Sequence, residues 1–166
     1  MDAERVQLVE SRPAEWAERF EALLEELLGL LGAEVRIEHI GSTAVPDLPS
    51  KDVVDVLVGV APNLVASVSN RLRATGFVLE GQRDEHAWLT RWKSGRRVCV
   101  LHVVETGGRQ WRRRIAFRDL LRRDANARAV YLQTKRAAEA ETSGWDDYTH
   151  AKTETVHRLL RTTSSY

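Results

Sequence analysis

The segment whose residue types could most readily bind a ligand or catalyse a reaction runs from a Gly-Ser pair to an aspartate inside an apolar stretch. Gly41-Ser42 follows a β-branched run, and a glycine and a serine at the end of a strand let a phosphate approach the backbone closely. The serine hydroxyl and the amides from Thr43 onward would then donate hydrogen bonds. Lys51 adds a positive charge before Asp55. The pattern predicts an anion-binding turn beside a carboxylate.

Asp55 itself needs a partner. It lies within the apolar run VVDVLV, and a carboxylate on a buried strand is costly unless it binds a metal or meets a cation. Mg²⁺ suits a carboxylate beside a phosphate site. A salt bridge to Lys51 or Arg118 is the alternative, and the residues leave both open. Gly41-Ser42 can also be a plain turn, but the order of the three features favours a functional site.

Periodicity in the sequence predicts the elements that position these residues. Apolar residues recur every three or four positions in 14–31, which is typical of an amphipathic helix, whereas 35–40 and 53–60 are rich in β-branched residues, as strands are. The same criteria predict further elements: a helix over 64–74, strands over 77–80, 87–92 and 97–104, and helices over 111–122, 125–140 and 145–160. The fold class is therefore α+β, a mixed β-sheet flanked by helices with a helical C-terminal cover.

Composition bounds the class of protein. The 166 residues suit one domain over 1–166, and 43% hydrophobic with 30% charged residues is ordinary globular usage. No run approaches the roughly 18 apolar residues of a membrane span, and the N-terminus lacks the features of an export signal. Cys99 is the single cysteine, which excludes an internal disulfide. We expect a cytoplasmic protein without a membrane partner.

Binding of nucleic acid is not expected. The C-terminal half is more basic than the N-terminal half, yet solvated helix faces produce the same balance. Arg112, Arg113 and Arg114 point in three directions on a helix and are predicted to be solvated surface. The five tryptophans are of a type that more often fills a core than stacks on bases.

The motifs together resemble one known family. They are EHIGSTAVPDL at 38–48, Lys51 with VVDVLV at 53–58, LHVVE at 101–105, FRDLLR at 117–122, Tyr131 with Lys135, and Tyr148 with Lys152. On these residues the chain is identified as a member of the GrpB family of small bacterial proteins. The resemblance covers nearly the whole sequence.

The resemblance implies a nucleotidyltransferase-like fold. In that superfamily a Gly-Ser turn grips a triphosphate, and a pair of carboxylates on one strand with a third acid on a later strand holds two Mg²⁺ ions. Here Asp55 matches the first acid, but Leu57 stands where its pair belongs and His102 where the third acid belongs. Asp55 and His102 remain the candidate Mg²⁺ ligands. Val100 replaces the first histidine of the family's His-x-His pair.

Further candidates come from the neighbouring segments. Glu38 and Glu105 are candidate general bases beside Asp55 and His102. The helical part supplies candidates for phosphate binding and pocket closure: Arg118, Arg122, Lys135, Tyr148 and Lys152. A salt bridge from Arg118 to Asp55 or Glu38 is the structural alternative. We predict that six residues converge on one cleft, with Asp55 and His102 on the same face of the sheet: Glu38, Ser42, Lys51, Asp55, His102 and Arg118.

Three functions remain open at this point. The first is a nucleotidyl- or phosphoryl-transferase that uses Mg²⁺, a nucleoside triphosphate and a small acceptor. The second is a domain that binds a nucleotide or phosphorylated metabolite without transfer. The third is a metal-independent enzyme that uses the same residues for a small carboxylate or amine. All three predict a small-molecule ligand, and none specifies the oligomeric state.

Overall fold

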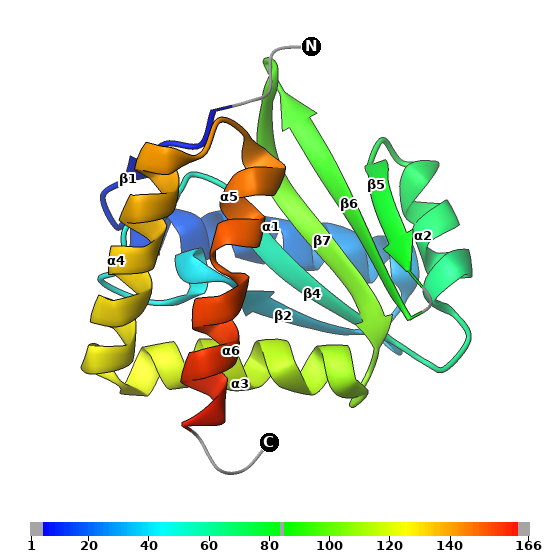
Figure 1. Cartoon of the computed structure of the whole chain (residues 1–166). Coiled ribbons are helices and arrows are strands. Elements are labelled where there is room, and N and C mark those ends of the chain that lie inside the picture. Colours follow the sequence, from blue (N-terminus) through cyan, green and yellow to red (C-terminus); the bar gives the residue numbers. More distant parts are fainter. Residues whose placement is uncertain (1–4, 84, 163–166) are drawn as a thin grey trace.

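A five-stranded mixed sheet forms the centre of the protein (Figure 1). The computed structural model describes residues 5–83 and 85–162. The sheet has the order β2-β4-β7-β6-β5, with β4 and β7 parallel and the other neighbours antiparallel. Its strands are β2 (Arg36–Ile40), β4 (Val54–Val60), β5 (Val78–Arg83), β6 (His86–Lys93) and β7 (Arg96–Glu105). The expected mixed α+β architecture is confirmed.

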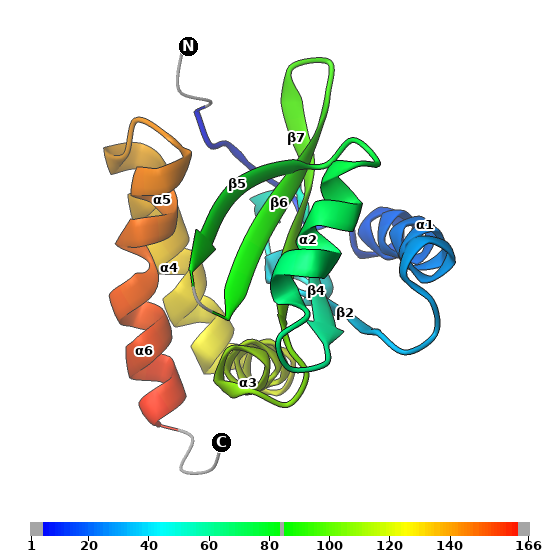
Figure 2. The same ribbon diagram turned by 90° about the vertical axis from the view of Figure 1, so that its right-hand side faces the viewer.

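One face of the sheet carries the main apolar core. Helices α1 (Pro13–Leu31) and α2 (Val65–Arg73) cover this face, as Figure 2 shows. Alternate strand residues such as Val56 and Leu101 point into it, and Trp16 of α1 is fully buried there. Pro13 supplies the preset φ of a first helical turn, and Gly32 ends α1 with φ of 86°.

The opposite face meets the C-terminal helices. They are α3 (Arg109–Arg123), α4 (Ala125–Glu141), α5 (Trp145–Ala151) and α6 (Thr153–Arg161). Leu57 and Val104 pack against Trp111 of α3, which anchors one end of this cover on the sheet. Asp124 accepts hydrogen bonds from two amides in the first turn of α4 and so fixes the corner between α3 and α4.

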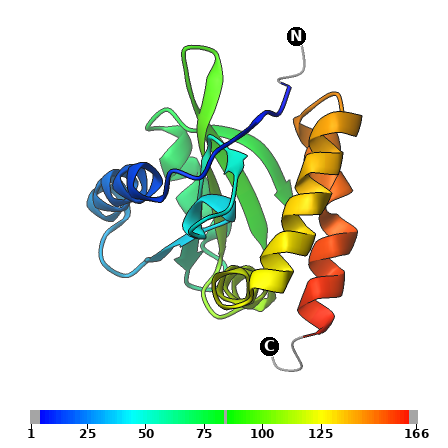
Figure 3. The same cartoon turned by 90° about the vertical axis from the view of Figure 1, so that its left-hand side faces the viewer.

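A small second sheet positions the residues before β4. Strand β1 (Leu8–Val9) pairs antiparallel with β3 (Ser50–Lys51), and Figure 3 shows the N-terminal segment running beside this loop. A 3-10 turn, η1 (Ser42–Ala44), follows β2 directly. The loop between β2 and β4 is therefore held at its beginning and near its end, on the side of the sheet that α4 covers.

The sequence predicted most of these elements but not all of them. Strands β1 and β3 were missed because two-residue strands carry no periodicity. The helix predicted over 145–160 is two helices, α5 and α6, divided at Lys152. The break is local, since Lys152 keeps helical angles (φ −83°, ψ −16°) and its carbonyl accepts from the amide of Val156. The apolar spacing of the segment therefore continues through it. No helix in the described part of the chain is both long and apolar enough to cross a membrane.

We predict that the central strand β7 dominates stability. Leu101→Ala should lower the free energy of unfolding by about 2 to 5 kcal/mol, because the side chain is fully buried and leaves a cavity. Leu64→Ala, at a residue that is 45% exposed, is the matched control and should change it by less than about 0.5 kcal/mol. Urea denaturation measures both. Equal losses in the two variants would contradict this account of the core.

Candidate functional site

Asp55 lies on β4 and faces the C-terminal helices. Its neighbours Val54 and Val56 point into the α1–α2 core, so alternation along the strand turns Asp55 to the other face. His102 on the adjacent strand β7 shares that face, with its Nε2 atom 3.7 Å from Oδ1 of Asp55. The predicted convergence of these two residues is confirmed. Both side chains stay partly accessible, at 16% for Asp55 and 20% for His102.

Gly41 brings the turn after β2 against this carboxylate. Its φ of 74° is in the left-handed region, and a Cβ atom there would stand 2.6 Å from Oδ2 of Asp55. Ser42, the first residue of η1, is buried and shares a hydrogen bond with the phenol of Tyr131. The Gly-Ser pair thus does form a close backbone approach, and the group that it approaches in the folded chain is Asp55.

Two lysines place positive charge beside Asp55. Burial opposes ionisation of this carboxyl, but Lys51, His102 and Lys152 outweigh it and hold its pKa below the usual value. The Nζ atom of Lys51 lies 3.8 Å from the ring centre of Trp145, at the start of α5. That of Lys152 lies 4.5 Å from the ring centre of Tyr148. The aromatic rings orient both ammonium groups by cation–π contacts.

Positively charged side chains outnumber negatively charged ones around Asp55. Burial lowers the pKa of Lys152 to about 8, an effect that Asp55 partly offsets. Lys135 is fully buried; burial and then the charges of Lys152 and Lys51 bring its pKa well below the ordinary value for lysine. Its Nζ atom donates to the carbonyl of Pro49 at 2.7 Å, so Lys135 also ties α4 to the loop before β4.

A second histidine extends the site away from Asp55. Nε2 of His86 on β6 and Nδ1 of His102 lie 3.1 Å apart in a hydrogen bond, and the two rings stack with centroids 5.3 Å apart. Burial and neighbouring cations lower the pKa of His86 to about 2, and burial also lowers that of His102. Sequence reasoning missed His86. Period-two alternation on β6 opposite His102 was the signal that could have found it.

Arg114 of α3 corrects one sequence prediction. It was expected on the solvated surface, but its side chain is half-buried and acts electrostatically on Asp55, His86 and His102. Burial lowers its pKa to about 10, an effect to which Arg113 adds. The signal was present in the sequence, because Arg114 precedes Arg118 by four residues and so shares its helix face.

Several predicted ligand-binding residues have structural partners instead. Arg118 donates to Oε2 of Glu38 at 2.7 Å and to the carbonyl of His39 at 3.2 Å, which fixes α3 on β2. The candidate base Glu38 is therefore already paired, through the structural alternative that the sequence left open. Arg122 donates to the carbonyl of Ala44 at 2.9 Å.

Thr43 and Glu105 also lie outside the Asp55 cluster. The hydroxyl of Thr43 lies 2.9 Å from Nε2 of His39, whose ring stacks on Phe20 of α1. Glu105 pairs with Val60 at the far end of β4, five residues beyond the position opposite Asp55. At about 3.3 Å per residue that is roughly 16 Å along the strand, too far for Glu105 to act with Asp55 on one small group.

The donors around Asp55 do not fit Mg²⁺. This ion prefers carboxylate oxygens and water in an octahedral shell. Both ring nitrogens of His102 are engaged, one with His86 and one toward Asp55, and two lysines compete for the carboxylate. Within 5–83 and 85–162, no three His, Cys, Asp or Glu side chains are grouped so that they could hold a metal ion.

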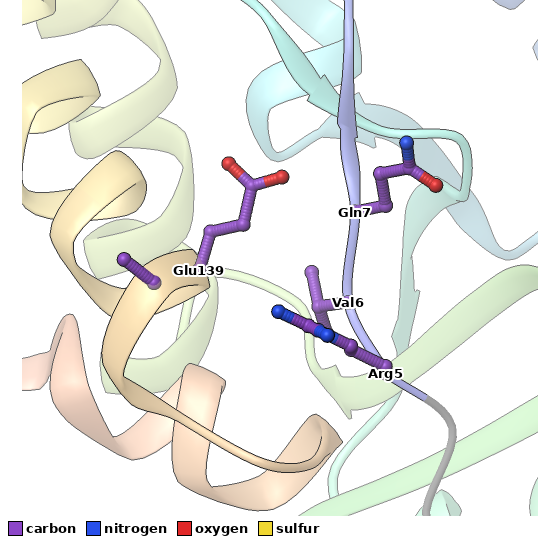
Figure 4. A pocket seen from close by; sticks show the side chains of 5 residues that line it. Arg5, Val6, Gln7 and Glu139 are labelled. Carbon is purple, nitrogen blue, oxygen red and sulfur yellow. The ribbon is translucent and has the colours of Figure 1, made fainter.

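A separate hollow lies between the N-terminal segment and α4. It has a volume of about 470 Å³ and is lined by Arg5, Val6, Gln7, Glu139 and Ala140 (Figure 4). The Glu139 carboxylate accepts a hydrogen bond from the amide of Leu8 at 2.9 Å, which joins β1 to α4. None of the residues that surround Asp55 lines this hollow, so it is separate from the candidate site.

Comparison with known proteins assigns the whole chain to a family. The model of the GrpB protein family matches residues 5–162. The chain belongs to the GrpB family. A UPF0157 protein of Deinococcus radiodurans is 37% identical over 95% of this chain and 82% of its own length. The crystal structure of the conserved protein GrpB from Enterococcus faecalis has a TM-score of 0.78 and 26% identity, covering 96% of this chain and all of that one.

The fold also resembles that of nucleotidyltransferases. A structure of the Cid1 poly(U) polymerase with bound Mg 3′-dATP has a TM-score of 0.56 and 16% identity, over 86% of this chain and 49% of that one. At this identity the likeness concerns the fold alone.

We predict that Gly41 is required for its close approach to Asp55 as well as for its φ. Gly41→Ala should destabilise the fold by about 1 to 3 kcal/mol more than Gly107→Ala. Gly107 has the same φ of 74°, but a Cβ atom there meets nothing within 4 Å, so it reports the backbone cost alone. Urea denaturation of the two variants gives the difference. Equal destabilisation by Gly41→Ala and Gly107→Ala would show that the turn after β2 can shift to accommodate a Cβ atom without displacing the carboxylate.

We also predict a pH-dependent contribution from Asp55. Its folded pKa is lowered, so the stability that it contributes is complete above the unfolded pKa of about 4 and is lost as pH falls through the folded value. Asp55→Asn should therefore cost about 3 kcal/mol at pH 7, and this cost should fall by up to about 1 kcal/mol at pH 3.

Asp47→Asn is the control for this experiment, because Asp47 is exposed and asparagine tolerates its positive φ. Urea denaturation at both pH values measures the effect. If the free energy of unfolding of Asp55→Asn equalled that of the wild type at pH 7, the charges of the lysines would not need this carboxylate for their compensation.

Proposed function

We propose that this GrpB protein binds a small phosphorylated molecule at the Asp55 site, with the phosphate held by Lys51 and Lys152. The excess of positive charge around Asp55 carries the proposal. Asp55 neutralises only part of the charge that Lys51, Lys152 and Arg114 bring to the face of the sheet. A phosphate with two negative charges would complete the balance.

The surroundings of the lysines support a phosphate rather than a bulkier polyanion. Both ammonium groups are oriented by aromatic rings, and Lys152 is half-buried with a lowered pKa. A desolvated ammonium gains more from an anion than a solvated one does, because the effective dielectric is lower. The hydroxyl of Ser42, next to Tyr131, lies at the start of η1 and adds a neutral donor.

Binding is favoured over metal-dependent transfer by the chemistry of the donors. Two-metal phosphoryl transfer depends on acids that hold the ions between the reacting oxygens. Here Leu57 and His102 replace two of those acids, and lysines face the remaining carboxylate. A phosphate held by lysines needs no ion for charge balance. The fold shared with Cid1 therefore supports an anion-binding site, and the binding domain without transfer is the function that we favour.

We predict that Lys152 controls this binding. Inorganic tripolyphosphate should bind the wild type in the presence of EDTA, and Lys152→Ala should weaken binding by about 1.5 to 3 kcal/mol through loss of a charge-assisted hydrogen bond. Affinity should fall as pH rises through about 8, because Lys152 then loses its proton, and this pH dependence should vanish in the variant.

Isothermal titration calorimetry measures these affinities. Lys93→Ala removes an exposed lysine on β6 and should leave binding unchanged. Absence of binding to the wild type, or equal affinity in Lys152→Ala, would refute the proposed function. A requirement for Mg²⁺ in the wild type would instead favour the metal-dependent alternative.

A further inference from the structure

An aromatic platform lies on the same face of the sheet as Asp55. Trp88 of β6 is the cross-strand partner of His102 and is half-buried. On its other side it pairs with Gly81 of β5, where a Cβ atom would stand 1.9 Å from the indole ring. The indole ring therefore packs directly on Gly81, and a side chain larger than hydrogen is excluded at that position.

The charge of Asp55 favours one tautomer in each of the two histidines. Nε2 of His102 lies 3.7 Å from Oδ1 of Asp55, and the ionised carboxylate favours the form of His102 that carries its proton on Nε2. In a neutral ring Nδ1 of His102 is then the acceptor, and Nε2 of His86 must donate to it. Nδ1 of His86 is consequently unprotonated. The His86 ring, which carries this acceptor nitrogen, has its centroid 5.1 Å from that of the Trp88 ring.

The distance between Trp88 and Asp55 suits a two-part ligand. Asp55 is on β4 and Trp88 on β6, with β7 between them. Two strand spacings of about 4.8 Å and an offset of two residues of about 3.3 Å each along the strands put them roughly 12 Å apart. That span is comparable to the one between the phosphate chain and the base of a nucleotide. Arg114 of α3 acts on His86, His102 and Asp55, and so contributes positive charge between the two ends.

We propose that the ligand is a nucleoside phosphate whose base stacks on Trp88 and donates an N–H group to Nδ1 of His86. The proposal rests on the proposed function, since the phosphate is the one held by Lys51 and Lys152. Stacking on the indole face accepts any base, whereas the acceptor nitrogen selects bases that present a donor at that edge. The same face of the sheet then binds the base at one place and the phosphate at another.

The test compares nucleotides with their phosphate chain alone. Calorimetric titrations use ATP, GTP, CTP, UTP and inorganic tripolyphosphate with the wild type, Trp88→Leu and Trp88→Phe. At least one nucleotide should bind the wild type about tenfold or more tightly than tripolyphosphate, as expected for one stacked base. Trp88→Leu keeps an apolar side chain but removes the aromatic face, and it should abolish this difference without changing the affinity for tripolyphosphate. Trp88→Phe should keep most of it.

Two further variants sharpen the experiment. Trp92→Ala removes the exposed tryptophan of the same strand and should leave the preference for nucleotide intact. His86→Phe should reduce the discrimination among the four bases while stacking persists. Two results would overturn the base site alone. In the first, tripolyphosphate binds and no nucleotide binds more tightly than it does. In the second, Trp88→Leu lowers the affinity for nucleotides and for tripolyphosphate equally. Failure of all five ligands to bind the wild type would overturn the base site together with the proposed function.

Discussion

An ionised carboxylate on an inner strand of the sheet has to be matched by positive charge. Asp55 sits between apolar neighbours, where an unpaired charge would cost several kcal/mol. Lys51 reaches it from the short strand β3 and Lys152 from the junction of α5 and α6. Segments far apart in sequence are thus coupled through one group. Gly41 belongs to the same arrangement, since only a glycine lets the turn after β2 approach the carboxylate so closely.

The basic residues of the C-terminal helices divide into two kinds according to what they meet. Arg118 and Arg122 meet a carboxylate and a backbone carbonyl, and they hold α3 against β2 and η1. Lys152 and Arg114 act electrostatically on Asp55, whose single charge they share with Lys51. The first kind stabilises the cover on the sheet. The second leaves positive charge on a partly accessible face, and the proposed binding of a phosphate rests on this charge. The same fold supports polymerases, but the site and not the fold decides the reaction.

Most of the secondary structure and the centre of the site could be predicted from the sequence. Helix and strand periodicity are local properties, so the core helix α1, the apolar strand β4 and the antiparallel strands up to β7 were predicted at nearly their observed positions. Alternation along β4 and β7 placed Asp55 and His102 on one face because side-chain direction in a strand follows residue parity. Gly41 was recognised because a turn after a strand has a compositional signal.

Only the tertiary structure decided what each charged side chain does. Nothing local separates Arg114 from Arg118, yet packing of α3 on the sheet turns one toward Asp55 and gives the other to Glu38. The partnership of His86 with His102 depends on the register of β6 against β7, which the sequence does not encode locally. A hydrogen bond or ion pair requires two groups to meet at about 3 Å, and elements distant in the chain reach that precision only when the whole core has packed.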